Sequence, residues 1–165
     1  RRFERVGDAG GVTIVDDYAH NPAKVRAAVA TGRGALPQGG RLVVVFQPHL
    51  YSRTRDFAAE FGAALAPADL VVVTDVYAAR EDPIPGVTGA LVADAVRALR
   101  PQTEVRFVPG PADLVPTVIG AVRPGDLVIT IGAGDITGVG PALLERLELP
   151  DQRGGRVADP TVEAI

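Results

Sequence analysis

Short apolar runs alternate with stretches of helical periodicity along most of the chain. Leu42–Phe46, Leu70–Val73 and Leu127–Ile131 are almost wholly apolar and rich in β-branched residues, which is typical of strands buried on both faces. Glu104–Val108 alternates more and predicts a further strand. Between these runs apolar residues recur every three or four positions, and this spacing predicts helices that separate the strands.

The first twenty residues have the pattern of a β-hairpin. Gly10 and Gly11 supply the turn, and Val12–Val15 supplies the return strand. Asn21 then precedes Pro22, a combination typical of a helix N-cap followed by proline at the first helical position. A helix is therefore expected directly after the hairpin.

The later helices have weaker start signals. We expect Ser52 or Thr54 to cap the second helix and Thr88 to open the third. Two more helices are predicted over Pro111–Val122 and Gly138–Leu147. The apolar side chains expected to face the core from the second and third helices include Phe57, Phe61, Leu91 and Leu99.

The alternation of strands and helices predicts an α/β fold: a mostly parallel sheet flanked by helices, with right-handed crossovers and an N-terminal β-hairpin. We assign residues 1–149 to this domain. Residues 150–165 lack periodicity and are rich in Gly, Pro and charge, so they are interpreted as a flexible tail. In such sheets ligands bind at the carboxyl ends of the strands.

Composition narrows the classes of function. The chain has 165 residues, a formal net charge of −3 and no cysteine. This charge does not favour nucleic-acid binding, and the lack of cysteine excludes disulfides and thiolate catalysis. The apolar runs are too short to span a bilayer. Arg1–Glu4 leads into no apolar stretch, so no signal peptide is predicted, and we interpret the chain as a part of a longer protein.

The scarce histidines and tyrosines all follow predicted strands. Tyr18 and His20 come after the hairpin, His49 and Tyr51 after the next strand, and Tyr77 after the third. Because parallel strands end at one edge of a sheet, this clustering favours a polar small-molecule site there. The tyrosines are equally compatible with packing as lids on helix ends, and His20 with a histidine bonded to backbone.

Charged residues in the same loops have competing interpretations. Asp16 is interpreted as a turn cap, whereas Asp17 fits either a cap or an acceptor for ribose hydroxyls. Arg53, near a helix N-terminus, favours binding of a carboxylate or phosphate. Arg55 is instead expected to pair with a nearby acid, Asp56 or Glu60.

Several catalytic motifs are missing from the chain. It has no G-x-x-x-x-G-K-[ST] loop, no Ser-His-Asp elbow and no H-E-x-x-H. Gly132–Gly134 is only a weak phosphate-loop signal, since its glycines are also compatible with tight strand-to-helix packing. No metal site is predicted, and an ATP-dependent reaction would need another domain to hold the nucleotide.

Four ordered motifs carry a family resemblance. They are Asp16–Pro22 (DDYAHNP), Phe46–Thr54 (FQPHLYSRT), Asp75–Gly86 (DVYAAREDPIPG) and Gly132–Ile136 (GAGDI). Together they resemble the C-terminal domain of the Mur ligases, over about residues 2–147, and the second and third resemble the members that add L-alanine. The Asp-Asn-Pro-Arg motif of the diaminopimelate-adding members is absent.

The resemblance implies a Rossmann-like domain of a three-domain cytoplasmic enzyme of peptidoglycan biosynthesis. Such a ligase joins L-alanine to UDP-N-acetylmuramate, using ATP to form an acyl phosphate. The N-terminal domain binds the UDP-sugar, and the central domain holds most of the ATP and Mg²⁺. The C-terminal domain binds the amino acid and closes over ATP, so the isolated chain is expected to be inactive, with no catalytic residue of its own.

The resemblance also assigns roles to particular residues. Arg53 resembles the clamp for the alanine carboxylate, with His20, His49 and Tyr18 around it, and Asp17 resembles the residue that contacts the ATP ribose. No nucleic acid or membrane partner is implied. Two alternatives remain open: a sister ligase for another amino acid or a recycled peptide, and a non-catalytic nucleotide-binding module.

Overall fold

The computed structural model describes residues 2–149, and the strands of this part form one six-stranded sheet. The sheet order is β1-β2-β6-β3-β4-β5. In chain order the strands are β1 (Glu4–Ala9), β2 (Val12–Asp17), β3 (Leu42–Phe46), β4 (Leu70–Val73), β5 (Glu104–Phe107) and β6 (Leu127–Ile131). The hairpin pair β1–β2 is antiparallel and every other pair is parallel, which confirms the predicted sheet.

The strand register brings the loops of interest to one edge. Asp17 pairs with Ile131, Ile131 with Phe46, and Phe46 with Val73. The carboxyl ends of β2, β6, β3 and β4 therefore lie next to one another. The loops that follow these strands carry the four motifs, so segments distant in sequence meet at this edge.

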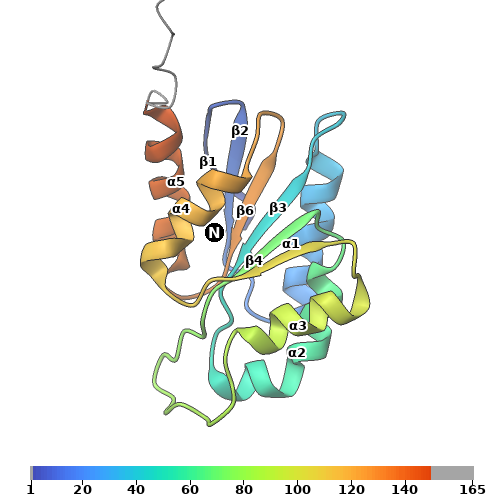
Figure 1. Ribbon diagram of the computed structural model, residues 1–165, viewed down its shortest axis with the longest axis vertical. Coiled ribbons are helices and arrows are strands. Elements are labelled where there is room, and N and C mark those ends of the chain that lie inside the picture. The colour runs from blue at the N-terminus through green and yellow to red at the C-terminus, as the bar shows by residue number, and fades with distance from the viewer. Residues whose placement is uncertain (1, 150–165) are drawn as a thin grey trace, which may run out of the picture.

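Helices cover both faces of the sheet (Figure 1). The helices are α1 (Pro22–Ala35), α2 (Tyr51–Leu65), α3 (Ala90–Leu99), α4 (Pro111–Ala121), the 3₁₀ turn η1 (Asp135–Gly138) and α5 (Val139–Glu148). The first three pack on one face and α4 and α5 on the other. Because consecutive strand residues point to opposite faces, Val44 and Phe46 join the first core cluster and Val43 and Val45 the second.

Several local predictions are confirmed. The three apolar runs are strands over the predicted residues. Gly10 and Gly11 form the hairpin turn with φ of 59° and 76°, conformations that glycine adopts without steric cost. The side chain of Asn21 accepts a hydrogen bond from the Lys24 amide at 3.0 Å, and Pro22 opens α1.

Other local predictions are wrong. Helix α2 begins at Tyr51, and its N-cap residue Leu50 provides no side-chain cap, so neither Ser52 nor Thr54 caps it. Phe57 is 44% exposed because its backbone leaves helical geometry (φ −122°, ψ 17°), which breaks the regular spacing of the apolar face.

The third helix agrees with the prediction in part. It begins at Ala90, and the hydroxyl of Thr88 accepts a hydrogen bond from the Ala90 amide at 3.2 Å, so Thr88 stands at the helix start. Leu99 is the last residue of α3 and is 58% exposed. Helix α3 packs against α2 as well as β4 and β5, so its contacts are not confined to a single apolar stripe that faces the sheet.

Two sequence predictions concern the chain as a whole. Within residues 2–149 no helix is long and apolar enough to cross a membrane. The predicted tail 150–165 lies outside the described residues.

Candidate amino-acid and nucleotide site

Two loops at the carboxyl edge are joined through His49 and Tyr77. The residues form a parallel β-bridge, in which the Leu50 amide donates to the Tyr77 carbonyl at 2.9 Å and the Tyr77 amide donates to the Pro48 carbonyl at 2.8 Å. Their rings also stack, with centroids 5.7 Å apart and an interplanar angle of 16°. The loop after β4 thus fixes the imidazole that follows β3.

The structure brings the two predicted histidines together. The ring centroids of His20 and His49 lie 6.3 Å apart in an edge-on arrangement. The Tyr18 ring meets His20 edge-on at 5.5 Å. Tyr18, His20, His49 and Tyr77 therefore form a continuous row of rings across the ends of β2, β3 and β4, whereas Tyr51 starts α2 and has no ring contact in the described part.

Arg53 connects the two histidine loops. Its Nη1 donates to the His20 carbonyl at 3.4 Å and lies 3.3 Å from Nδ1 of His49. Since Arg53 stands in the first turn of α2 and His49 lies four residues earlier, the start of this helix sets the distance between them. The guanidinium has five donors, and these two contacts do not exhaust them.

The partners of the histidines determine their neutral tautomers. Nδ1 of His20 faces the Tyr18 carbonyl at 3.1 Å; a carbonyl only accepts, so the proton is on Nδ1 and Nε2 keeps a lone pair. Nδ1 of His49 faces Arg53, which only donates, so the His49 proton is on Nε2. The pair therefore offers one acceptor, Nε2 of His20, and one donor, Nε2–H of His49.

The surroundings of His49 disfavour its charged form. Partial burial is the largest cause that lowers the pKa of His49 below 6.5, followed by the positive charge of Arg53 and the charge that His20 carries when it is protonated; Glu81 acts in the opposite direction. These surroundings favour the neutral imidazole of His49, which agrees with its role as acceptor for Arg53.

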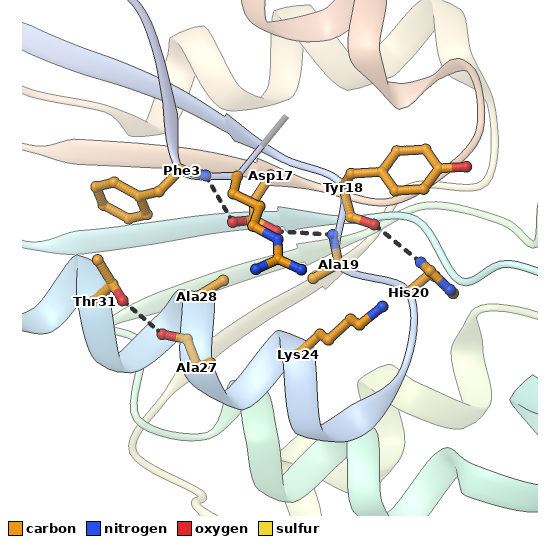
Figure 2. Close-up of a pocket in the computed structure, with 10 residues that line it drawn as sticks. Phe3, Asp17, Tyr18, Ala19, His20, Lys24, Ala27, Ala28 and Thr31 are labelled. Atoms are coloured by element: carbon orange, nitrogen blue, oxygen red, sulfur yellow. Dashed lines mark hydrogen bonds between the residues drawn. The ribbon is translucent and has the colours of Figure 1, made fainter.

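Asp17 lies in a pocket of about 460 Å³ beside α1. Its oxygens accept hydrogen bonds at 2.8 Å from the amides of Phe3 and Ala19 (Figure 2). Asp17 thus fastens the start of the chain to the end of β2. Each oxygen retains a second lone pair, so this structural role leaves room for bonds to ligand hydroxyls.

The pocket also contains cationic residues that the sequence patterns did not single out. Arg2 and Lys24 line it together with His20, and Figure 2 shows Lys24 extending from α1 on the same side as His20. Lys24 lies in the first turn of α1, which starts at this edge of the sheet. This position in the sequence is the one feature that could have indicated its place at the pocket. The positive charges favour an anionic ligand.

Two charged residues interpreted from the sequence have defined partners. Asp16 is buried in β2 and accepts a bond from the Thr130 hydroxyl at 2.7 Å, which connects β2 to β6. Arg55 pairs with Asp56 at 2.8 Å on an exposed surface, as expected.

The glycines after β6 have a packing role. A Cβ on Gly134 would lie 2.6 Å from Oε1 of Gln47 and 2.7 Å from Cδ2 of Tyr77, and closer still to Cγ of the same ring. Gln47 also donates to Asp135 at 2.6 Å and accepts from the Ile136 amide at 3.2 Å. The close contacts favour the packing interpretation of the loop over a phosphate loop.

Residues 2–149 contain no group of three or more side chains of the metal-ligating types placed to hold one ion. This part of the chain therefore does not by itself fit a Mg²⁺ ion.

The family described as "Mur ligase, glutamate ligase domain" matches residues 1–134. The chain belongs to the Mur ligase family. It is 60% identical over 147 residues to the UDP-N-acetylmuramate–L-alanine ligase of Kineococcus radiotolerans and 55% identical over 148 residues to that of Cutibacterium acnes; these alignments cover 89% and 90% of the chain.

Among solved structures, the UDP-N-acetylmuramate–alanine ligase of Thermotoga maritima superposes with a TM-score of 0.67 at 29% identity. The superposition covers 88% of this chain and 29% of that one. The fold is that of a Mur ligase C-terminal domain. The chain spans 31% of the length of both curated relatives, so it corresponds to about a third of a Mur ligase.

Proposed function

We propose that this chain is the amino-acid-binding domain of an ATP-dependent ligase that joins L-alanine to UDP-N-acetylmuramate, a step of peptidoglycan biosynthesis in the cytoplasm. The observation that carries the proposal is the arrangement of Arg53 between the two histidines. It offers a cation and two imidazole nitrogens of opposite character, which is what a zwitterionic amino acid requires.

The contacts suggest how the amino acid is held. Its carboxylate binds the guanidinium of Arg53 and Nε2–H of His49, and its ammonium group donates to Nε2 of His20. Tyr18, at the end of the row of rings, shapes the side-chain pocket. These contacts hold the amino group in place so that, once deprotonated, it attacks the acyl phosphate of the sugar carboxylate; a C–N bond forms and phosphate leaves.

The Asp17 pocket supports a second part of the proposal. Its free lone pairs accept the ribose hydroxyls of ATP, and the charges of Arg2 and Lys24 favour the phosphates. Mg²⁺ and most of the ATP contacts belong to the central domain of the full-length ligase, whose N-terminal domain takes the UDP-sugar. Closure of the domains brings the Asp17 pocket to the nucleotide and excludes water from the acyl phosphate.

The test is ADP formation by the full-length ligase supplied with UDP-N-acetylmuramate and a single amino acid. L-alanine should support turnover more efficiently than glycine, L-serine, D-glutamate or a tripeptide. A preference for one of the others identifies a sister ligase. No amino-acid-dependent ADP with any of them supports the non-catalytic alternative, and turnover by the isolated 165-residue chain would contradict the need for another domain.

A further inference from the structure

Helix α2 begins without a cap from its own sequence. A helix leaves its first amides without intrahelical partners, and a side chain of the N-cap residue usually satisfies one of them. The N-cap here is Leu50, which has φ of 71° and no side chain able to accept. The amides at the start of α2 therefore need an acceptor from elsewhere.

Glu81 supplies that acceptor from the loop after β4. Its Oε2 accepts from the Ser52 amide at 3.0 Å, and its Oε1 accepts from the Ser52 hydroxyl. The bonds to Ser52 are the largest causes that lower the pKa of Glu81 below 4.5, with smaller contributions from the Tyr51 amide and Arg53. Glu81 is thus a charged cap, 29 residues away from the helix residue it binds.

The capped turn is the one that carries the proposed carboxylate clamp. Ser52 immediately precedes Arg53, which contacts the imidazole of His49 and the carbonyl of His20. The loop of Glu81 is the same loop whose Tyr77 stacks on His49. The loop after β4 therefore contacts the segment 48–53 at both ends. Tyr77 forms the β-bridge with His49 near its start, and Glu81 caps the beginning of α2 at Ser52.

The Glu81 carboxylate also changes which groups are left for a ligand. With Glu81 bonded to the Ser52 amide, this amide of α2 is occupied. A second carboxylate at the same place would be repelled by Glu81. The ligand carboxylate is directed to the side chains of Arg53 and His49.

We propose that Glu81 is a positioning residue of the amino-acid site, which acts by capping α2 and holding Arg53 and His49 in register. This inference rests on the proposed function of Arg53. It predicts that loss of Glu81 affects the amino-acid substrate selectively, because Glu81 does not line the pocket that contains Asp17.

The experiment compares KM and kcat of the full-length ligase carrying Glu81→Ala, Glu81→Gln or Ser52→Ala. Glu81→Ala should raise the KM for L-alanine about fivefold, the fold-change that corresponds to the ~1 kcal/mol a helix cap contributes, with little change in the KM for ATP or the UDP-sugar. Glu81→Gln, which keeps an oxygen for the Ser52 amide, should restore most of the loss. The adjacent and exposed Asp82 provides the control Asp82→Ala, which should behave as wild type.

A purely structural role would give a different result: kcat would fall with the fraction of folded enzyme while the KM for L-alanine stayed constant, and that outcome would overturn the proposal. If Glu81→Ala does not fold, Ser52→Ala decides, because it removes the bond from the Ser52 hydroxyl to Glu81; an unchanged KM for L-alanine in Ser52→Ala would also overturn the proposal.

Hydrogen exchange of the same proteins separates this proposal from the proposed function. Peptides covering 48–54 should exchange faster in Glu81→Ala, while α4 stays unchanged. A wild-type enzyme that forms no ADP with L-alanine refutes the proposed function, and the exchange result then still decides whether Glu81 caps α2. Unchanged exchange over 48–54 would overturn the capping role.

Discussion

Tyr77 packs against Gly134 so closely that the glycine has no room for a side chain. A Cβ at position 134 would lie 2.7 Å from Cδ2 of the Tyr77 ring. Because the same ring stacks on His49, the loop after β6 supports the position of a histidine that follows β3. The glycine therefore helps to shape the proposed amino-acid site.

Replacing Gly134 by alanine should destabilise the chain by about 1–3 kcal/mol, the usual cost of overpacking. The measurement is the free energy of unfolding of the 165-residue chain in urea. Gly120→Ala is the matched control: Gly120 lies in α4, where an added methyl group would meet nothing within 4 Å, so this change should stabilise by about 0.5–1 kcal/mol. Equal effects of the two substitutions would contradict the packing role.

Removing the guanidinium of Arg53 should weaken amino-acid binding. A carboxylate that loses a charge-assisted partner loses about 2–4 kcal/mol, which raises the KM for L-alanine at least about 30-fold in the full-length ligase. Arg55→Ala is the control, because Arg55 pairs with Asp56 on the exposed surface. An unchanged KM for L-alanine in Arg53→Ala would refute the clamp.

The pair Arg41–Asp126 should matter far more for stability than other ion pairs. Asp126 has a side chain 1% exposed and receives Nε and Nη2 of Arg41 at 3.0 and 2.7 Å. Arg41→Ala leaves a buried carboxylate short of its cation, at a cost of about 3 kcal/mol. The exposed pair Arg33–Asp69 is the comparison, and Arg33→Ala should cost at most about 1 kcal/mol in the same urea titration.

His49 should make the chain less stable in mild acid. Its folded-state pKa lies below 6.5 because of burial, Arg53 and His20, against Glu81. As the pH falls through about 6.5, the unfolded chain therefore binds the proton first, and stability is lost until the pH reaches the lowered folded pKa.

The measurement is the urea midpoint at about pH 7.5 and about pH 5.5. His49→Gln should lose less stability between the two than wild type. His20→Gln removes only a smaller cause of the lowered His49 pKa than burial and Arg53, so it should keep most of the dependence. Identical pH profiles for wild type and His49→Gln would show that His49 does not contribute.

Much of the fold could be predicted because its signals are local. The strands over Leu42–Phe46 and Leu127–Ile131 are buried on both faces, so their sequences are almost wholly apolar and their ends are sharp. The start of α1 is marked by adjacent residues, Asn21 and Pro22. The cap of α2 could not be predicted, because Glu81 comes from another loop and leaves no signal near Ser52.

The candidate site could likewise be predicted only in part from the sequence. The order of residues along the chain is enough to place the histidines, the tyrosines and Arg53 after strands, and a parallel α/β sheet collects the carboxyl ends of its strands at one edge. The folded chain was needed to show that β6 lies between β2 and β3, that Arg53 reaches the carbonyl of His20, and that Asp17 binds the Phe3 amide. Such contacts depend on strand order and on the distances between loops, which no local pattern of residues encodes.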